Sequence, residues 1–188
     1  MIQASAQYIV QALLAGKTPA VSARVGGEQR RGHGRPILTL ILRADYAGIP
    51  AAGHLTHGRI ANLNEVLGVL HWEYADRLSL RIVDFAALSF DEQVQIGHST
   101  DLLIGTHGVG LTNMLWMVPG SAVVEISTSY GERKNQHYRN MAGFMRHSYH
   151  RVEGLVPLLG SVGTVELSRL RIAMDSALRS LELPKMIN

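Results

Sequence analysis

The sequence predicts an α/β fold in which helices cover both faces of a parallel, doubly wound sheet. Short apolar runs of strand length alternate along the chain with segments of helical periodicity. Several of these runs are continuous rather than alternating, which is typical of strands that are buried on both faces. Over 188 residues, 46% are apolar and 18% are charged, which is sufficient for a globular core.

The first 35 residues are expected to form a helix and a loop in front of the sheet. Apolar residues between positions 9 and 14 fall on one helical face, and Gly16 followed by Pro19 is a stop signal. Residues 21–35 are rich in glycine and arginine, which predicts a loop. We therefore expect the sheet domain to begin at residue 36.

Residues 36–188 are expected to form that sheet domain. The apolar run 37–42 is the first strand, and residues 44–58, with three glycines and a proline, form a long loop. Asn62 can then cap a helix whose apolar positions continue to residue 72.

The alternation continues to the end of the chain. Further strands are expected at 78–83, 101–105, 121–126 and 148–152, and further helices at 89–96, 108–116, 136–145 and 167–181. Ser89 and Glu92 form a capping-box pattern at the start of the helix 89–96. Pro119 and Gly120 form the turn before the strand 121–126.

The chemistry is expected where the strand 101–105 meets the helix 108–116. Glycines at 105, 108 and 110 let the backbone approach a ligand and free the φ angles of the turn. Open α/β sheets bind ligands at such turns, and the amides at a helix start suit a diphosphate. Tight packing of a helix on a sheet also selects glycine, so packing is the alternative reading.

The glycine spacing argues against one common class of enzyme. A nicotinamide-dependent oxidoreductase is expected to show G-x-G-x-x-G near the start of its domain, followed by an acidic residue about 20 positions on. Here the spacing is G-x-x-G-x-G, and the motif lies past the middle of the chain. We keep a Rossmann-type oxidoreductase only as a minor alternative.

Residues 101–126 read D-L-L-I-G-T-H-G-V-G-L-T-N-M-L-W-M-V-P-G-S-A-V-V-E-I. This run resembles the signature of family 61 glycosyltransferases, which include protein O-linked N-acetylglucosamine transferases and plant xylosyltransferases. Arg43, Arg59 and the segment 98–101 follow the family order, and the resemblance covers about residues 37–152. It implies a Rossmann-like domain similar to the C-terminal half of a GT-B glycosyltransferase.

The resemblance also implies a function. Such a domain is expected to hold a UDP-sugar, from which the enzyme transfers the sugar to a protein or glycan hydroxyl with inversion and without metal. An N-terminal domain that completes the acceptor site in the family is not evident here, so a catalytically silent nucleotide-sugar-binding module is the alternative. Members of the family work in the Golgi or the endoplasmic reticulum lumen. The chain shows no signal peptide and no transmembrane run.

Two arginines are candidates for holding the diphosphate. Arg43 follows the first strand, where side chains face the ligand crevice, and Arg59 precedes the next helix. A surface ion pair is the alternative for each. The sequence has no Asp-x-Asp motif for manganese, so charge neutralisation by arginine is the consistent choice.

The remaining candidates lie in the signature. His107 could donate a hydrogen bond to a phosphate or to a sugar hydroxyl, and it is not assigned as the general base. Glu125 ends an apolar strand and could accept the ribose hydroxyls, or be a solvated strand end. Thr112 and Asn113 could contact phosphate or sugar, or cap the helix locally. The resemblance places donor contacts at Arg43, Arg59, Gly105, His107, Gly108, Gly110, Leu111, Thr112, Asn113 and Glu125.

Other residues are expected to be structural. Asp84 has no motif around it, and Trp72, Trp116, Met114 and Met117 share helical faces with aliphatic residues, which favours the core over a sugar-stacking platform. The histidine pairs at 54/57 and 147/150 lack partners at a zinc-like spacing and are expected in loops or at the surface.

Composition excludes several further classes. The net charge of +3 comes from scattered basic residues rather than a stripe, so no nucleic-acid partner is expected. The chain has no cysteine, which rules out disulfides and a thiol nucleophile. We expect no cofactor and no metal, with the UDP-sugar serving as the donor substrate.

Overall fold

The computed structural model describes residues 34–42, 59–127, 135–153, 156–157 and 162–182. The expected N-terminal helix, the loop 44–58 and Arg43 lie outside these ranges. Within them, no helix is long and apolar enough to span a membrane.

The centre of the protein is a five-stranded sheet in which every pair of neighbouring strands is parallel. The strand order is β3-β1-β4-β5-β6, which is 2-1-3-4-5 when the strands of this sheet are counted along the chain. This confirms the predicted α/β, Rossmann-like fold. The strands are β1 (Ile37–Ile41), β3 (Ser79–Val83), β4 (Leu102–Thr106), β5 (Ala122–Ile126) and β6 (Ser148–Val152).

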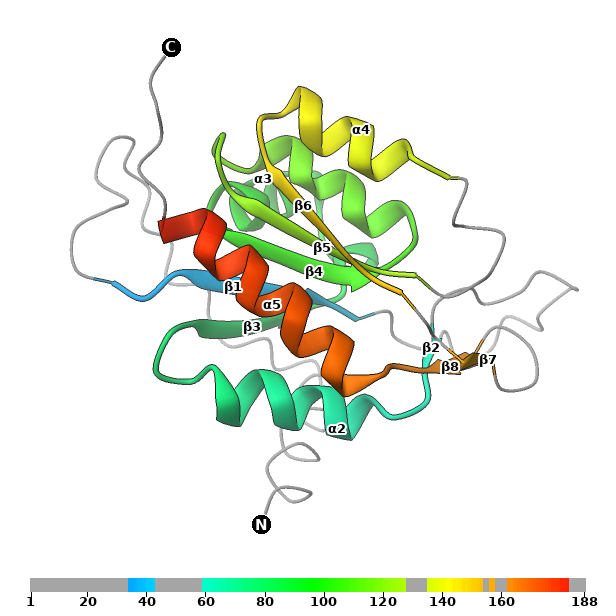
Figure 1. Ribbon diagram of the computed structural model, residues 1–188. Coiled ribbons are helices and arrows are strands. Elements are labelled where there is room, and N and C mark those ends of the chain that lie inside the picture. Colours follow the sequence, from blue (N-terminus) through cyan, green and yellow to red (C-terminus); the bar gives the residue numbers. More distant parts are fainter. Residues whose placement is uncertain (1–33, 43–58, 128–134, 154–155, 158–161, 183–188) are drawn as a thin grey trace, which may run out of the picture.

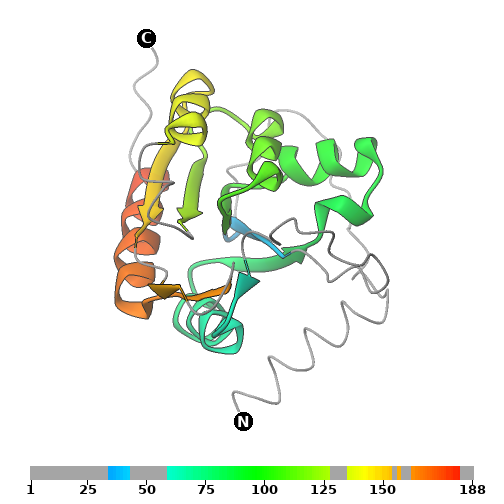
Figure 2. The same cartoon turned by 90° about the vertical axis from the view of Figure 1, so that its right-hand side faces the viewer.

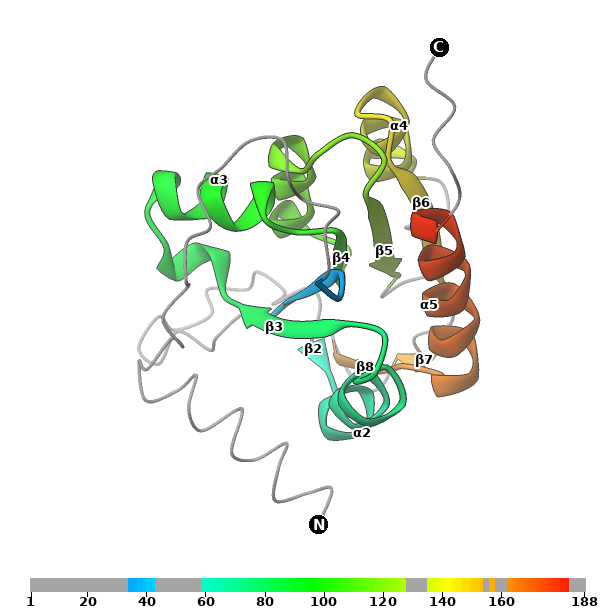
Figure 3. The ribbon, with the colours of Figure 1, turned by 90° about the vertical axis from the view of Figure 1, so that its left-hand side faces the viewer.

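Helices cover both faces of this sheet (Figures 1 and 3). One face packs against α2 (Leu63–Gly68), its π-helical continuation η1 (Val69–Glu73) and α5 (Leu167–Glu182). The other packs against α3 (Phe90–His98), η3 (Val109–Trp116) and α4 (His137–Phe144), with the short 3-10 turn η2 (Phe85–Ala87) after β3. The helix expected at 108–116 is present, but it is a 3-10 helix.

Alternate residues of the strands divide the core in two. Leu102, Ile104 and Val124 point toward α2 and α5, whereas Leu103 and Val123 point toward α3, η3 and α4. All five side chains are fully buried. This explains why the sequence shows continuous apolar runs here, since both faces of each strand are covered.

A small second sheet was not predicted from the sequence. It has the order β2-β8-β7 and lies near the carboxyl ends of the large sheet, which face the viewer in Figure 2. Its strands are β2 (Arg59–Ile60), β7 (Val156–Pro157) and β8 (Val162–Thr164). Strands of two or three residues carry too little periodicity to be recognised in a sequence.

Asn62 connects this small sheet to the rest of the fold. Asn62 is the N-cap residue of α2, as predicted, but its side chain makes no capping hydrogen bond. Instead its Oδ1 accepts from the Val165 amide at 2.8 Å, and its Nδ2 donates to the Val165 carbonyl at 3.0 Å. The residue therefore fixes the start of α2 against the segment that enters α5.

Several local predictions are confirmed. Ser89 and Glu92 form the capping box of α3. Asp84 is structural, because its carboxylate accepts from the Ala86 amide at 3.0 Å at the start of η2. Met114 and Met117 are buried in the core.

Two predictions about burial are wrong. Trp72 is 50% exposed, because it lies on the outer side of η1. His147, expected in a loop or at the surface, is buried directly before β6, and its Nε2 lies 3.0 Å from the Met114 carbonyl.

Candidate functional site

The candidate site lies where β4 ends and η3 begins. In the strand order, β1 is flanked by β3 on one side and β4 on the other, so the chain reverses its direction of winding between β1 and β4. In open α/β sheets, ligands bind outside the carboxyl ends of the strands at this switch point. His107 and Gly108 follow β4 directly at this position.

The backbone of the turn presents amides at this edge. The His107 amide still donates to the Ile126 carbonyl at 2.9 Å, continuing the ladder between β4 and β5. Within the described residues, the hydrogen bonding of η3 starts with the Leu111 amide, which donates to the Gly108 carbonyl at 3.0 Å. The amides of the first residues of a helix have no acceptor within it. Those of Gly108, Val109 and Gly110 are therefore available to a ligand.

The three glycines of the turn have different environments. A Cβ at Gly105 or at Gly110 would lie 3.0 Å from side-chain atoms of Ile41, so both positions need glycine for packing against β1. A Cβ at Gly108 would meet its nearest neighbour, the Thr106 carbonyl, at 3.8 Å, an ordinary contact. Only Gly108 is therefore free of a packing requirement.

The expectation that these glycines free the φ angles of the turn is wrong. Gly108 has a φ of 163°, which is extended backbone that other residues also adopt. Among the described glycines, the left-handed conformation occurs at Gly120, with a φ of 85°, in the turn before β5. Glycine at positions 105 and 110 is explained by the nearby Ile41 side chain, whereas the space around Gly108 is open.

His107 is held by a buried carboxylate. Its Nδ1 lies 2.5 Å from Oε1 of Glu125, whose side chain is 1% exposed. Glu125 faces the side of the sheet covered by α4, and the ring of Tyr138 on that helix meets the His107 ring edge-on at 5.0 Å. The imidazole is 16% exposed, so a small part of it reaches the surface at the turn.

Two residues of β6 complete the surroundings of Glu125. The hydroxyl of Tyr149 donates to Oε2, and Nη2 of Arg151 lies 4.0 Å from Oε1. Burial, and next the hydrogen bond to Glu125, raise the pKa of the Tyr149 phenol well above its usual range. The phenol is therefore a hydrogen-bond donor at any ordinary pH, and both oxygens of Glu125 already accept from protein groups.

The first turn of η3 uses its polar side chains locally. Thr112 Oγ1 donates to the Val109 carbonyl at 2.7 Å, and Asn113 Nδ2 donates to the Gly110 carbonyl at 3.1 Å. Leu111 is fully buried in the core. Thr112 and Asn113 thus donate to carbonyls three residues earlier and do not cap η3, and contact with a ligand stays a prediction for all three residues.

Arg43 and the Arg59 side chain are not among the parts of the chain that the structure describes. Arg43 lies outside the described residues, directly beyond Leu42 after β1. Arg59 belongs to β2 through its backbone. Their predicted contacts with a diphosphate stay predictions. Within the described ranges, no three histidine, aspartate or glutamate side chains converge as metal ligands do.

Comparison with known proteins identifies the family of this chain. The sequence model described as Glycosyltransferase 61 matches residues 32–124, which include β1 to β4, the glycine-rich turn and η3. The chain belongs to glycosyltransferase family 61.

Individual relatives match parts of this chain. The EGF domain-specific O-linked N-acetylglucosamine transferase of Canis lupus familiaris is 38% identical over 77 residues, which is 40% of this chain and 14% of that protein. The protein of the same name from Gallus gallus is 35% identical over 77 residues, with the same coverage. Beta-1,2-xylosyltransferase RCN11 of Oryza sativa subsp. japonica is 25% identical over 115 residues, which is 60% of this chain and 21% of that protein.

These alignments span only a small part of the curated relatives, 14% of the first of them. They support the family 61 assignment. The activity, substrates and partners of a whole enzyme are taken up below as proposals.

Sequence reasoning missed part of the environment of His107 in this family 61 domain. Asn135 Nδ2 lies 3.3 Å from His107 Nε2, and Tyr149 and Arg151 hold Glu125. The sequence did contain a signal for Tyr149 and Arg151. Glu125 pairs with Arg151 in the register of β5 and β6, so polar residues at alternate positions of the predicted strand 148–152 face the same side as Glu125.

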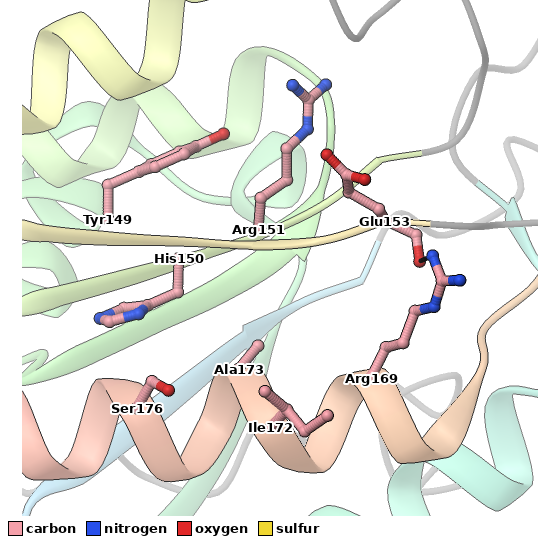
Figure 4. Close-up of a pocket in the computed structure, with 8 residues that line it drawn as sticks. All are labelled: Tyr149, His150, Arg151, Glu153, Arg169, Ile172, Ala173 and Ser176. Atoms are coloured by element: carbon pink, nitrogen blue, oxygen red, sulfur yellow. Dashed lines mark hydrogen bonds between the residues drawn. The ribbon is translucent and has the colours of Figure 1, made fainter.

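A hollow lies between β6 and α5 (Figure 4). It has a volume of about 460 Å³ and is open to solvent. His150 points toward α5 here, whereas Tyr149 and Arg151 extend from the opposite side of the strand. Burial, and next the Arg179 charge, lower the pKa of His150. The hollow is separate from the turn at Gly108.

Proposed function

We propose that this chain provides the donor site of a glycosyltransferase that transfers a sugar from a UDP-sugar to a protein or glycan hydroxyl. The observation that carries the proposal is the turn at Gly108, which lies at the switch point of the sheet and inside the matched family segment. Binding of the nucleotide at such a turn uses backbone amides, whose positions depend on the fold rather than on particular side chains.

The diphosphate is proposed to lie against the start of η3. The amides of Gly108, Val109 and Gly110 precede the first hydrogen bond of that helix, and the positive end of its dipole points the same way. Gly108 leaves room for close approach of the phosphate. Arg43 comes directly after Leu42 in the sequence, and we propose that Arg43 and Arg59 neutralise the leaving diphosphate without metal.

We propose roles other than direct contact with the UDP-sugar for three side chains, those of Glu125, Thr112 and Asn113. Both oxygens of Glu125 accept from protein groups, so a ribose contact requires that one of these bonds be exchanged. Its position supports holding the His107 ring at the turn. Thr112 and Asn113 support the proposal through the local bonds that shape the start of η3.

The acceptor and the compartment also belong to the proposal. The names of the relatives describe transfer to EGF domains and xylosyl transfer, and they support a protein or glycan as acceptor. The general base is left unassigned, a further N-terminal domain is the expected partner for acceptor binding, and no nucleic-acid partner is proposed. The Golgi or endoplasmic reticulum lumen stays a prediction.

Isothermal titration tests the proposal directly. We expect UDP to bind in EDTA, and added manganese to leave the affinity unchanged. NAD is expected not to bind, which separates the proposal from an oxidoreductase. Binding that is lost in EDTA and restored by manganese contradicts the metal-free part. If the folded protein does not bind UDP, the proposal of a donor site is contradicted.

A substitution at Gly108 tests the location of the site. Gly108→Val adds a side chain where space is open, so stability is expected to change little while UDP affinity is lost. A stable variant with native UDP affinity places the nucleotide elsewhere. Nucleotide-sugar binding combined with no transfer to any acceptor favours the catalytically silent module over the enzyme.

A further inference from the structure

The orientation of the Asn135 amide is determined by a backbone group. Its Oδ1 accepts from the His137 amide at 3.0 Å, so that atom is the oxygen, since a backbone N–H donates. The other side-chain atom, Nδ2, therefore faces His107 at 3.3 Å from Nε2. An amide nitrogen can only donate, so Nε2 of His107 is the acceptor in this contact.

This contact determines where the imidazole carries its proton. If Nε2 accepts, the ring is neutral and its proton lies on Nδ1, which donates to Oε1 of Glu125 at 2.5 Å. The groups around the ring agree with this state. The Tyr149 hydroxyl donates to Oε2 of Glu125, Nη2 of Arg151 lies 4.0 Å from Oε1, and Tyr138 of α4 contacts the ring edge-on.

We infer that His107 recognises a hydroxyl of the donor sugar through Nε2, and that it does not bind the phosphates. The inference rests on the proposed donor site at Gly108. Phosphate oxygens are hydrogen-bond acceptors, and two acceptors cannot pair, whereas a sugar hydroxyl can donate. The hydroxyl replaces the Asn135 amide as the donor to Nε2, so one hydrogen bond is exchanged for another.

The position of His107 fits this division of roles. The residue directly precedes Gly108, so its ring lies beside the amides proposed for the diphosphate. A sugar is attached to the terminal phosphate of its nucleotide, and a hydroxyl contact next to the phosphate site is therefore within reach. On this basis His107 distinguishes a UDP-sugar from UDP itself.

The first test compares UDP with UDP-N-acetylglucosamine and UDP-xylose by titration calorimetry. His107→Ala is expected to leave the Kd of UDP within twofold. For whichever sugar nucleotide has the lower Kd with wild-type protein, the variant is expected to raise that Kd by about 5- to 10-fold, because one hydrogen bond is lost. His98→Ala, which removes an exposed histidine at the end of α3, is the matched control and should change neither affinity. Melting temperatures measured on the same samples confirm that each variant is folded.

The outcomes separate the inference from the proposed function. An equal loss of affinity for UDP and for both sugar nucleotides in His107→Ala assigns the residue to the phosphates and overturns the inference, while the donor site stands. Failure of wild-type protein to bind any of the three ligands overturns the donor site itself.

A second test uses the wild-type protein, so it does not depend on the folding of a variant. Nitrogen-15 NMR of the His107 side chain distinguishes a protonated Nδ1 from a protonated Nε2. We expect a proton on Nδ1, and a shift of the Nε2 resonance that is larger with the sugar nucleotide than with UDP. A proton on Nε2, or equal shifts with both ligands, overturns the inference.

Discussion

The phenol of Tyr149 on β6 donates a hydrogen bond to the buried carboxylate of Glu125 on β5, and this bond joins the edge strand of the sheet to the candidate site. Through Glu125 it reaches His107 at the end of β4. Residues on three neighbouring strands therefore hold one imidazole at the turn.

Removing this phenol is expected to destabilise the protein. Tyr149→Phe leaves Oε2 of Glu125 buried without the phenol that donates to it, and a buried unsatisfied acceptor costs about 1–3 kcal/mol. Urea unfolding measures the loss. In a Glu125→Gln background the same substitution should cost less, and an equal cost in both backgrounds shows that the two residues are not coupled.

The glycines of the turn are expected to respond differently to the same change. Gly105→Ala and Gly110→Ala each place a Cβ 3.0 Å from the Ile41 side chain, and such overpacking costs about 1–3 kcal/mol. Gly108→Ala is the matched control and should alter stability by less than about 0.5 kcal/mol. Thermal unfolding checks all three.

A second substitution identifies the cause of these losses. Ile41→Val removes the Cδ1 atom that lies close to both new side chains. It is expected to recover part of the stability of Gly105→Ala. If Gly108→Ala proves as damaging as the other two, packing against Ile41 does not explain the pattern.

The start of α3 offers a local test of the capping box. Ser89→Ala removes the hydroxyl that accepts from the Glu92 amide and is expected to lower stability by about 1 kcal/mol. Ser89→Thr retains a hydroxyl at the same position and should be close to wild type in chemical denaturation. Similar losses in both variants argue against the cap as the cause.

Tyr74 is expected to make stability depend on pH under alkaline conditions. Burial, followed by the Asp175 charge and hydrogen bond, raises the pKa of Tyr74 to about 12. An unfolded tyrosine titrates near 10, so between about pH 10 and pH 12 the unfolded chain binds fewer protons and stability falls as pH rises. The loss is at most about 3 kcal/mol.

The control for this effect is Tyr74→Phe. The variant lacks the titrating group, so its stability should decline less steeply over the same pH interval, relative to its own value at neutral pH. Parallel curves for the two proteins assign the alkaline loss to other groups, among them Tyr149, whose pKa burial also raises.

Most of the fold could be predicted because its signals are local. Strands β1, β4 and β5 of the large sheet are largely apolar runs, and Ser89 and Glu92 mark a helix start in four residues. The small sheet could not be predicted, because its strands are too short to show the alternation of apolar and polar residues that marks a strand. The partner of the Asn62 side chain was missed because Val165 is 103 positions away.

The candidate site was predicted in part. The turn at Gly108 follows from the glycine pattern between a strand and a helix. The different environments of its glycines depend on Ile41, in a strand that is distant in sequence. The hydrogen-bonded state of His107 depends on Asn135, and a sequence carries no signal for that contact because it requires the orientation of an amide group.

The bonds between Asn62 and Val165 also bear on synthesis of the protein. A ribosome adds about 5–20 residues per second, so roughly 5–20 s pass between the translation of these positions. Throughout that interval α5 has not been made, and the apolar side chains of α2 and β1 that pack in its cluster lack their cover. Nascent chains of this protein are therefore expected to depend on chaperones that bind exposed apolar segments while translation proceeds.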